Sequence, residues 1–113
     1  MSLNLFAGVA VGDFSVSLAW YERLLGRGPS FFPHETEAVW ELAEGRLLYI
    51  VERPEHAGHA LQTVIIEGLD EVVAGAKARG VEAAKVETYA NGVRKVTYVD
   101  PDGSEIAFGM VPQ

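Results

Sequence analysis

Cysteine is absent from this chain of 113 residues. Its absence excludes disulfide bonds, thiolate nucleophiles and thiolate metal ligands, so histidine, aspartate and glutamate remain as the strong metal ligands. No apolar run approaches the roughly 18 residues that a membrane-spanning helix needs, and the amino end carries no basic segment followed by an apolar one that would indicate a secretory signal. We therefore expect a cytoplasmic protein with no membrane partner.

Basic residues are also few. Nine lysines and arginines against 16 aspartates and glutamates give a formal net charge of -7 at pH 7. Nucleic-acid binding needs clustered basic side chains, and here they are scattered among acids, so we expect no nucleic-acid partner. A cationic small ligand would be favoured by this charge, although an acidic balance is also typical of a domain that simply stays soluble.

The first half of the sequence predicts a strand, a helix and three further strands. An apolar run at 5–11 indicates the first strand, and the segment after it indicates a helix that Ser15 caps and Gly26 ends. The three strands that follow are predicted at 30–33, 36–43 and 46–52. The order of elements is therefore βαβββ.

The second half predicts the same order. It has an apolar run at 61–67, then a helical pattern at 69–79 that Gly80 closes. Its three remaining strands are predicted at 86–89, 93–99 and 104–111, with a hairpin signal at Asn91-Gly92.

We therefore expect a single α+β domain over residues 1–113, a length that leaves room for one core. Its repeat units cover about 4–52 and 61–111, and 53–60 forms a linker rich in turn residues. The paired βαβββ modules are predicted to form a curved mixed sheet around a cleft, with the helices on the outer face. Small molecules bind in concave sites of this kind.

Four short motifs carry a resemblance to a known family. They are Val11-Gly12-Asp13-Phe14 followed by Ser17, Trp20-Tyr21 with Leu24-Leu25-Gly26, Gly68-Leu69-Asp70 leading to Arg79-Gly80, and Asp100-Pro101-Asp102-Gly103 followed by Ile106. In this order the sequence resembles the vicinal oxygen chelate superfamily, which includes type I glyoxalases, ring-cleaving dioxygenases, fosfomycin resistance enzymes, and bleomycin and mitomycin binding proteins. The resemblance covers nearly the whole chain. It also implies a homodimer, in which a second chain often completes the cleft.

The resemblance further implies where a metal would be bound. Enzymes of this superfamily hold a divalent ion with His or Glu side chains, one each from the first and last strands of the two units. Those positions fall at or near Phe6, Tyr49, Leu61 and Ala107. A catalytic ion needs about three protein ligands, and these four residues offer at best one, so we expect no metal or other cofactor. His59, two residues before Leu61, is the one weak candidate ligand that remains.

Strand alternation predicts which side chains line the cleft. The candidate ligand-binding residues are Phe6, Phe32, His34, Trp40, Tyr49, Thr63, Tyr89 and Glu105. For the last strand, alternation places Glu105, Ala107 and Gly109 in the cleft and Ile106, Phe108 and Met110 under the helices. Whether Trp40 or its neighbour Glu41 faces the cleft depends on a hairpin register that the sequence leaves open.

Three functional hypotheses follow. The first is a metal-independent binding protein, similar in kind to the bleomycin-resistance branch, that sequesters a small aromatic or cationic compound. The second is a small lyase, isomerase or dioxygenase-like enzyme, which would use Glu105 or His34 as a general base or a displaced metal site. The third is an accessory or assembly module without a ligand.

Overall fold

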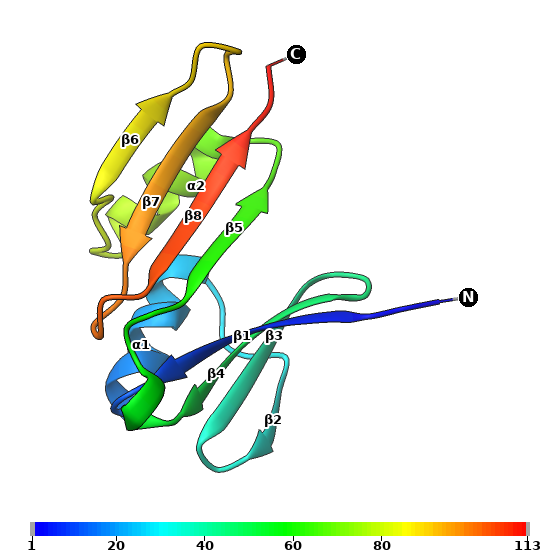
Figure 1. Cartoon of the computed structure of the whole chain (residues 1–113), viewed down its shortest axis with the longest axis vertical. Coiled ribbons are helices and arrows are strands. Elements are labelled where there is room, and N and C mark those ends of the chain that lie inside the picture. Colours follow the sequence, from blue (N-terminus) through cyan, green and yellow to red (C-terminus); the bar gives the residue numbers. More distant parts are fainter. Residues whose placement is uncertain (1, 113) are drawn as a thin grey trace.

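The chain folds into two modules of the same design, which a computed structural model describes for residues 2–112 (Figure 1). The first module contains β1 (Leu5–Val11), α1 (Phe14–Leu25), β2 (Phe31–His34), β3 (Glu37–Ala43) and β4 (Arg46–Glu52). The second contains β5 (Leu61–Ile65), α2 (Leu69–Ala78), β6 (Lys85–Thr88), β7 (Arg94–Val99) and β8 (Glu105–Met110). A short 3-10 helix, η1 (Pro54–His56), lies between the modules. The α+β class and the paired βαβββ order are confirmed.

Each module has its own four-stranded mixed sheet, with strand orders β1-β4-β3-β2 and β5-β8-β7-β6. In both sheets the first strand runs parallel to the last one, and the other pairs are antiparallel. The strand array is therefore divided into two four-stranded sheets, which lie at an angle to each other in Figure 1. Where β1 approaches β5, the side-chain amide of Gln62 donates to the carbonyl of Gly8 at 3.0 Å.

Local signals at both ends of α1 explain its length. Its N-cap is Asp13, whose carboxylate accepts from the backbone amide of Val16 at 3.2 Å, so the prediction that Ser15 caps the helix is wrong. A cap must precede the first helical residue, and Ser15 is already inside the helix. Gly26 ends the helix with a φ of 79°, as the sequence predicts. No helix within residues 2–112 has both the length and the apolar character needed to cross a membrane.

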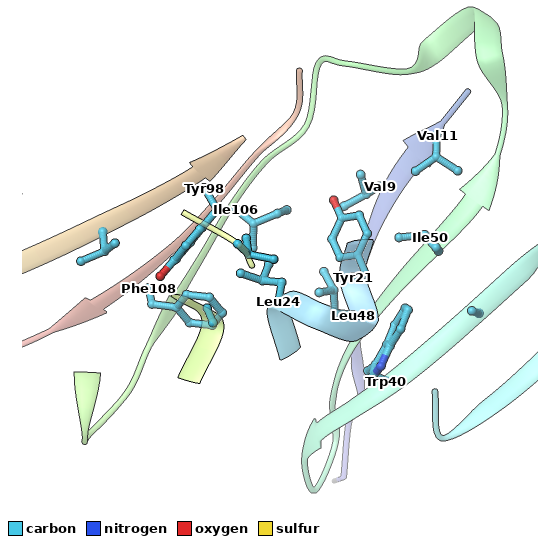
Figure 2. Close-up of a cluster of buried hydrophobic side chains, with 14 of the residues drawn as sticks. Val9, Val11, Tyr21, Leu24, Trp40, Leu48, Ile50, Tyr98, Ile106 and Phe108 are labelled. Atoms are coloured by element: carbon cyan, nitrogen blue, oxygen red, sulfur yellow. The ribbon is translucent and has the colours of Figure 1, made fainter. Parts of the chain in front are cut away.

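One hydrophobic core serves both modules (Figure 2). In that view Leu24 of α1 lies between Ile106 and Phe108 of the second module and Leu48 and Trp40 of the first. All five side chains belong to one cluster of buried residues. Because the helix of the first module packs against the sheet of the second, the relative orientation of the two sheets is fixed by core packing.

The turn between β7 and β8 anchors the second module to the first. Asp100 accepts three backbone amides of its own turn through Oδ1, while its Oδ2 accepts from the Tyr21 hydroxyl of α1 at 2.8 Å. Asp102 of the same turn also contacts the first module, because its carboxylate accepts a hydrogen bond from the backbone amide of Gly12 at 3.0 Å. Burial, reinforced by the charge of Asp100, raises the pKa of Tyr21 well above its usual range. The hydroxyl of Tyr21 therefore stays protonated and ties the two modules together.

Candidate ligand-binding site

The strand register assigns every residue of the inner strands to one of two faces. In the first sheet Val9, Leu48 and Ile50 are buried on the face that α1 covers. Their neighbours point the other way. We call this uncovered side the first open face; its residues include Phe6, Gly8, Glu37, Glu41, Leu47, Tyr49 and Val51. The second open face, on the other sheet, includes Leu61, Thr63, Ile65, Lys95, Thr97, Glu105, Ala107 and Gly109.

Both open faces expose large apolar side chains. Phe6 is 50% exposed, Leu61 is 75% exposed and Ile65 is 58% exposed. Apolar side chains on strand faces are normally covered, and a contiguous exposed group of them marks a surface that meets a ligand or another chain. Within one chain, the strand faces predicted for the cleft are therefore two surfaces that carry exposed apolar side chains beside buried ones such as Leu47, Thr97 and Ala107.

The first open face carries two neighbouring aromatic rings. Tyr49 lies directly opposite Gly8, and a Cβ placed on Gly8 would come within 2.5 Å of the ring carbon Cζ of Tyr49. The tyrosine ring therefore lies flat over the glycine, where any larger residue would displace it. Phe6 stands beside it, with 6.4 Å between the ring centroids and an angle of 60° between the ring planes.

Carboxylates lie on the same face as these rings. Glu37 pairs with Val51 and Glu41 pairs with Leu47, which places both side chains on the side of Tyr49. An aromatic face flanked by negative charge attracts cationic and aromatic molecules. The sequence offered Glu41 only as the alternative to Trp40, and the register of β3 decides for Glu41. Glu37 was not among the candidate site residues.

The second open face is aliphatic by contrast. Thr63 lies opposite Ala107, and Ile65 lies opposite Gly109. A Cβ on Gly109 would come within 2.9 Å of the Ile65 Cδ1 atom, so an aliphatic group covers the glycine here. Glu105 is exposed at the start of β8, and Glu87 of β6, which pairs with Lys95, is a second carboxylate on this face.

The four positions that the resemblance implies for a metal occupy matching places in the two sheets. Phe6 lies opposite the residue two before Tyr49, and Leu61 lies opposite the residue two before Ala107. Phenylalanine, leucine and alanine have no donor atom, and no group of three or more His, Asp or Glu side chains within residues 2–112 is arranged to hold an ion. The residues present do not fit a divalent metal ion. His59, the weak candidate, lies exposed before β5.

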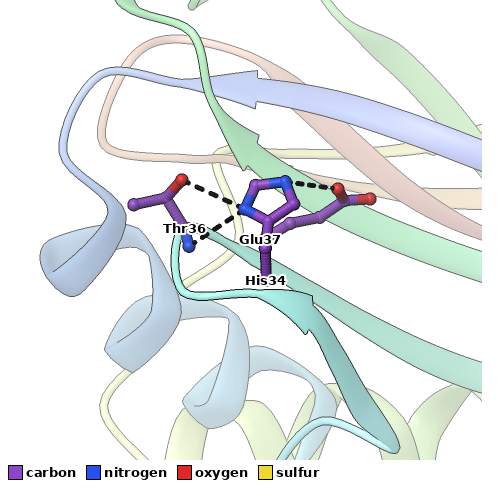
Figure 3. A network of polar contacts seen from close by, with 3 residues as sticks. All are labelled: His34, Thr36 and Glu37. Atoms are coloured by element: carbon purple, nitrogen blue, oxygen red, sulfur yellow. Dashed lines mark hydrogen bonds and ion pairs between the residues drawn. The ribbon is translucent and has the colours of Figure 1, made fainter.

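His34 belongs to a small surface network in the hairpin between β2 and β3 (Figure 3). Its Nδ1 atom accepts from the backbone amide of Thr36 at 3.3 Å, and its Nε2 atom lies 2.9 Å from a carboxylate oxygen of Glu37. These contacts fit the tautomer that carries its proton on Nε2. Since both ring nitrogens are engaged, His34 has no nitrogen free to act as a base on a substrate.

Trp40 requires a correction. It pairs with Leu48 on the helix-covered face, is 0% exposed, and its ring nitrogen donates to the carbonyl of Arg27 at 3.0 Å. The expectation that Trp40 lines the cleft is wrong, because the register of β3 turns Glu41 to the open face and Trp40 to the core. Its ring packs against Tyr21 of α1, with 6.1 Å between the centroids.

The remaining candidates are divided between the modules. Phe32 lies on β2 and Tyr89 follows β6, so these two exposed rings are at the outer strands of different sheets. Phe6 and Tyr49 share the first open face, while Thr63 and Glu105 share the second. The fold of a single chain does not unite the eight candidates at one place.

Two cavities lie where the modules meet. The larger, of about 240 Å³, is lined by Leu5, Ala7, Leu42, Arg46, Leu47, Leu48, Gln62, Thr63, Val64 and Ile65. The other, of about 210 Å³, is lined by Leu24, Leu25, Arg27, Leu42, Val64, Ile66, Val72, Arg79 and Phe108. Of the candidate ligand-binding residues only Thr63 contributes to either wall. These cavities arise from the packing of one module on the other, which strand alternation does not report.

Comparisons with known proteins complete the description of the site. No protein-family model and no curated protein matches the sequence. Among solved structures, a glyoxalase/bleomycin resistance protein from Catenulispora acidiphila is 79% identical, with a TM-score of 0.96 over 98% of this chain and 100% of that one. A bleomycin-binding protein in complex with bleomycin is 20% identical, with a TM-score of 0.78 over 98% of this chain and 100% of that one.

An enzyme also shares the fold. A lactoylglutathione lyase from Agrobacterium tumefaciens is 13% identical, with a TM-score of 0.76 over 97% of this chain and 94% of that one. At such low identity the likeness to the lyase and to the bleomycin-binding protein concerns the fold alone.

Proposed function

The chain belongs to the glyoxalase/bleomycin resistance protein family, and from that premise we propose that it sequesters a small aromatic or cationic molecule without a metal ion. The ligand binds on the first open face, against the ring of Tyr49. A second copy of the chain covers it from the other side, so that the working form is a homodimer. We assign this activity to the cytoplasm, which cell fractionation tests.

The observation that carries the proposal is the pair of rings on the first open face, of which Phe6 is half exposed and Tyr49 is partly buried. The ring centroids of Phe6 and Tyr49 are 6.4 Å apart, and Gly8 leaves room for the tyrosine ring against the sheet. A cation over such a ring gains about 0.5 to 2 kcal/mol, and Glu37 and Glu41 add favourable charge. None of these groups needs a metal ion to bind an organic cation.

The exposed apolar surface supports the second copy. Phe6 on one sheet and Leu61 and Ile65 on the other are at least half exposed in the single chain. Covering them removes apolar area from water, at about 25 cal/mol for each Å². Homodimers with a two-fold axis bury the same patch on each subunit, so each chain would supply one wall of two identical clefts.

An enzymatic role has weaker support. His34 has both ring nitrogens engaged, which leaves Glu105 on the second open face as the remaining candidate base. A base acts with a second group that polarises the substrate, and the aromatic rings of the first open face cannot polarise a carbonyl.

Isothermal titration calorimetry with bleomycin, the compound bound by one structural neighbour, tests the proposal. We expect saturable binding that Tyr49→Ala weakens at least about tenfold and Tyr49→Phe largely retains, since the ring supplies the contact. Calorimetry is preferable to tryptophan fluorescence because Trp40 is buried in the core. Absence of saturable binding contradicts the ligand class.

Two further measurements address the metal and the dimer. Elemental analysis of the purified protein should find no equimolar transition metal, and finding one contradicts metal independence. Analytical ultracentrifugation should give a dimer that Phe6→Glu shifts toward monomer, because the charge is placed in the covered surface. An unchanged monomer in the wild type would contradict the shared cleft.

A further inference from the structure

The cavity of about 210 Å³ lies on the side of the sheets that carries the helices, away from both open faces. Its wall is built from the end of α1, one side of α2 and the helix-covered faces of β3, β5 and β8. The apolar part of the wall is formed by Leu24, Leu25, Leu42, Val64, Ile66, Val72 and Phe108. Two arginines, Arg27 and Arg79, complete it.

Both arginines are held by backbone carbonyls. Arg27 donates to the carbonyl of Glu41, and Arg79 donates to the carbonyls of Arg23 and Leu24 at the end of α1. Within residues 2–112 neither guanidinium lies within 4 Å of a carboxylate, whereas Arg53 and Arg94 each have an acidic partner. Carbonyls orient a guanidinium and, at a helix C-terminus, offset part of its positive charge, but they do not neutralise it as a carboxylate does.

Arg79 is also confined sterically. A Cβ on Gly26 would lie 3.0 Å from its Cζ atom, and one on Gly75 would lie 3.1 Å from its Nη1 atom. The guanidinium therefore occupies a slot between the two helices that only glycines leave open. A positive group fixed in this way binds an anion at a smaller cost in side-chain entropy than a mobile surface arginine does.

We propose that this cavity binds a small carboxylic acid with an apolar body the size of a benzene ring. An apolar cavity of about 150 Å³ accepts benzene, so a volume of about 210 Å³ has room for a ring with a short acidic side chain. The ring packs against Val64, Val72 and Phe108, and the carboxylate meets the guanidinium groups. Arginine binds carboxylates through two parallel hydrogen bonds, which gives the acid an advantage over neutral analogues.

The site goes beyond the proposed function in both place and charge. The first open face favours cations through aromatic rings and glutamates, whereas this cavity presents arginines. Arg79 also caps the carbonyl end of α1, so its replacement disturbs the fold together with the site. Both arginines are exposed, and Arg27, which bonds only the carbonyl of Glu41, is the better residue to replace.

The probe is phenylacetate, titrated into protein labelled at its leucine and valine methyl groups and followed by NMR. We expect saturable shifts for Leu25, Val64 and Val72, with none for Val9 on the far side of the core. Arg27→Gln should weaken binding about tenfold or more, as expected for loss of a charged hydrogen bond. Arg23→Gln, the same change in charge on a side chain outside the cavity wall, should leave the affinity unchanged.

Neutral 2-phenylethanol carries the same ring and should bind at least about tenfold more weakly than the acid. Val72→Trp fills the cavity and should abolish the shifts of Leu25 and Val64, with circular dichroism confirming that the variant is folded. Absence of saturable shifts, equal affinity for the alcohol, or an equal effect of Arg23→Gln overturns the proposal. Tyr49→Ala should leave phenylacetate binding intact, which separates this site from the open faces.

Discussion

On the first open face a tyrosine ring covers a glycine, and on the second an isoleucine does. Gly8 lies on the first strand of its module and Tyr49 on the last, whereas Gly109 lies on the last strand and Ile65 on the first. The backbones of the two modules share one order of strands and one pattern of pairing. In the proposed homodimer, a ligand between a first and a second open face would therefore meet a ring on one side and an aliphatic surface on the other.

The helix-covered faces differ in a subtler way. Trp40 lies opposite the residue before Tyr49, and Tyr98 lies opposite the residue before Ala107, so the two buried aromatics occupy matching positions. The Trp40 ring nitrogen has a partner in the carbonyl of Arg27, while the Tyr98 hydroxyl has none among residues 2–112. The two modules keep a large buried ring at this place but not the polar contact that would satisfy it.

The largest expected effect comes from replacing these two rings by the same residue. Trp40→Phe should lower the free energy of unfolding by about 2 to 3 kcal/mol, because it opens a cavity and removes a hydrogen bond. Tyr98→Phe should change it by less than about 0.5 kcal/mol, because it removes only an unpartnered buried hydroxyl. Urea denaturation measures both. Equal losses in the two variants would show that Tyr98 has a partner, such as a buried water.

The contact between the modules gives the next effect. Tyr21→Phe removes the hydroxyl that donates a hydrogen bond to Asp100. It should lower the free energy of unfolding by about 1.5 to 2 kcal/mol at neutral pH. Asp100 keeps its three backbone donors in this variant, so the turn itself should remain formed. Urea denaturation at pH 7 checks the loss, and a cost within error of zero would mean that core packing alone joins the modules.

The same tyrosine predicts a dependence on alkaline pH. Its pKa is raised in the folded state, while in the unfolded chain it is about 10, so above pH 10 the unfolded state binds fewer protons than the folded state. The stability that Tyr21 contributes is complete below pH 10. Above it the wild type should lose up to about 1.4 kcal/mol per pH unit from this group. Tyr21→Phe lacks that loss, so the free energies of unfolding of the two proteins, plotted against pH, should converge between pH 10 and 11.5. Parallel plots would contradict a protonated Tyr21.

Much of the fold is readable from the sequence because its signals are local. β1 and β4 have the predicted bounds, since apolar runs there end at turns. β5 is shorter than predicted, Leu61–Ile65 instead of 61–67, because the chain must turn at Gly68, whose φ of 69° is left-handed. For β8, alternation correctly separates Glu105, which is exposed, from Ile106, which is buried.

The site is less readable because it depends on contacts between distant segments. The face that Trp40 occupies is set by the pairing of β3 with β4, which contains an irregularity between Glu41 and Ala43. The two arginines of the cavity between the modules lie 52 positions apart, one just after α1 and the other at the end of α2. Only the packing of one module on the other brings them to the same wall.

The smallest expected effect tests the glycines of the two open faces directly. Gly8→Ala forces the ring of Tyr49 off the sheet, because the new Cβ would lie 2.5 Å from it, and we expect a loss of about 1 kcal/mol together with weaker binding of bleomycin. Gly109→Ala meets the end of the flexible Ile65 side chain, which can rotate, and alanine also costs less backbone entropy than glycine in a strand. We therefore expect the stability of Gly109→Ala to stay within about 0.5 kcal/mol of the wild type. Thermal unfolding measures the stability of the two variants, and calorimetry measures their affinity for bleomycin. If the two alanine variants lose affinity equally, the tyrosine ring does not distinguish the first open face from the second.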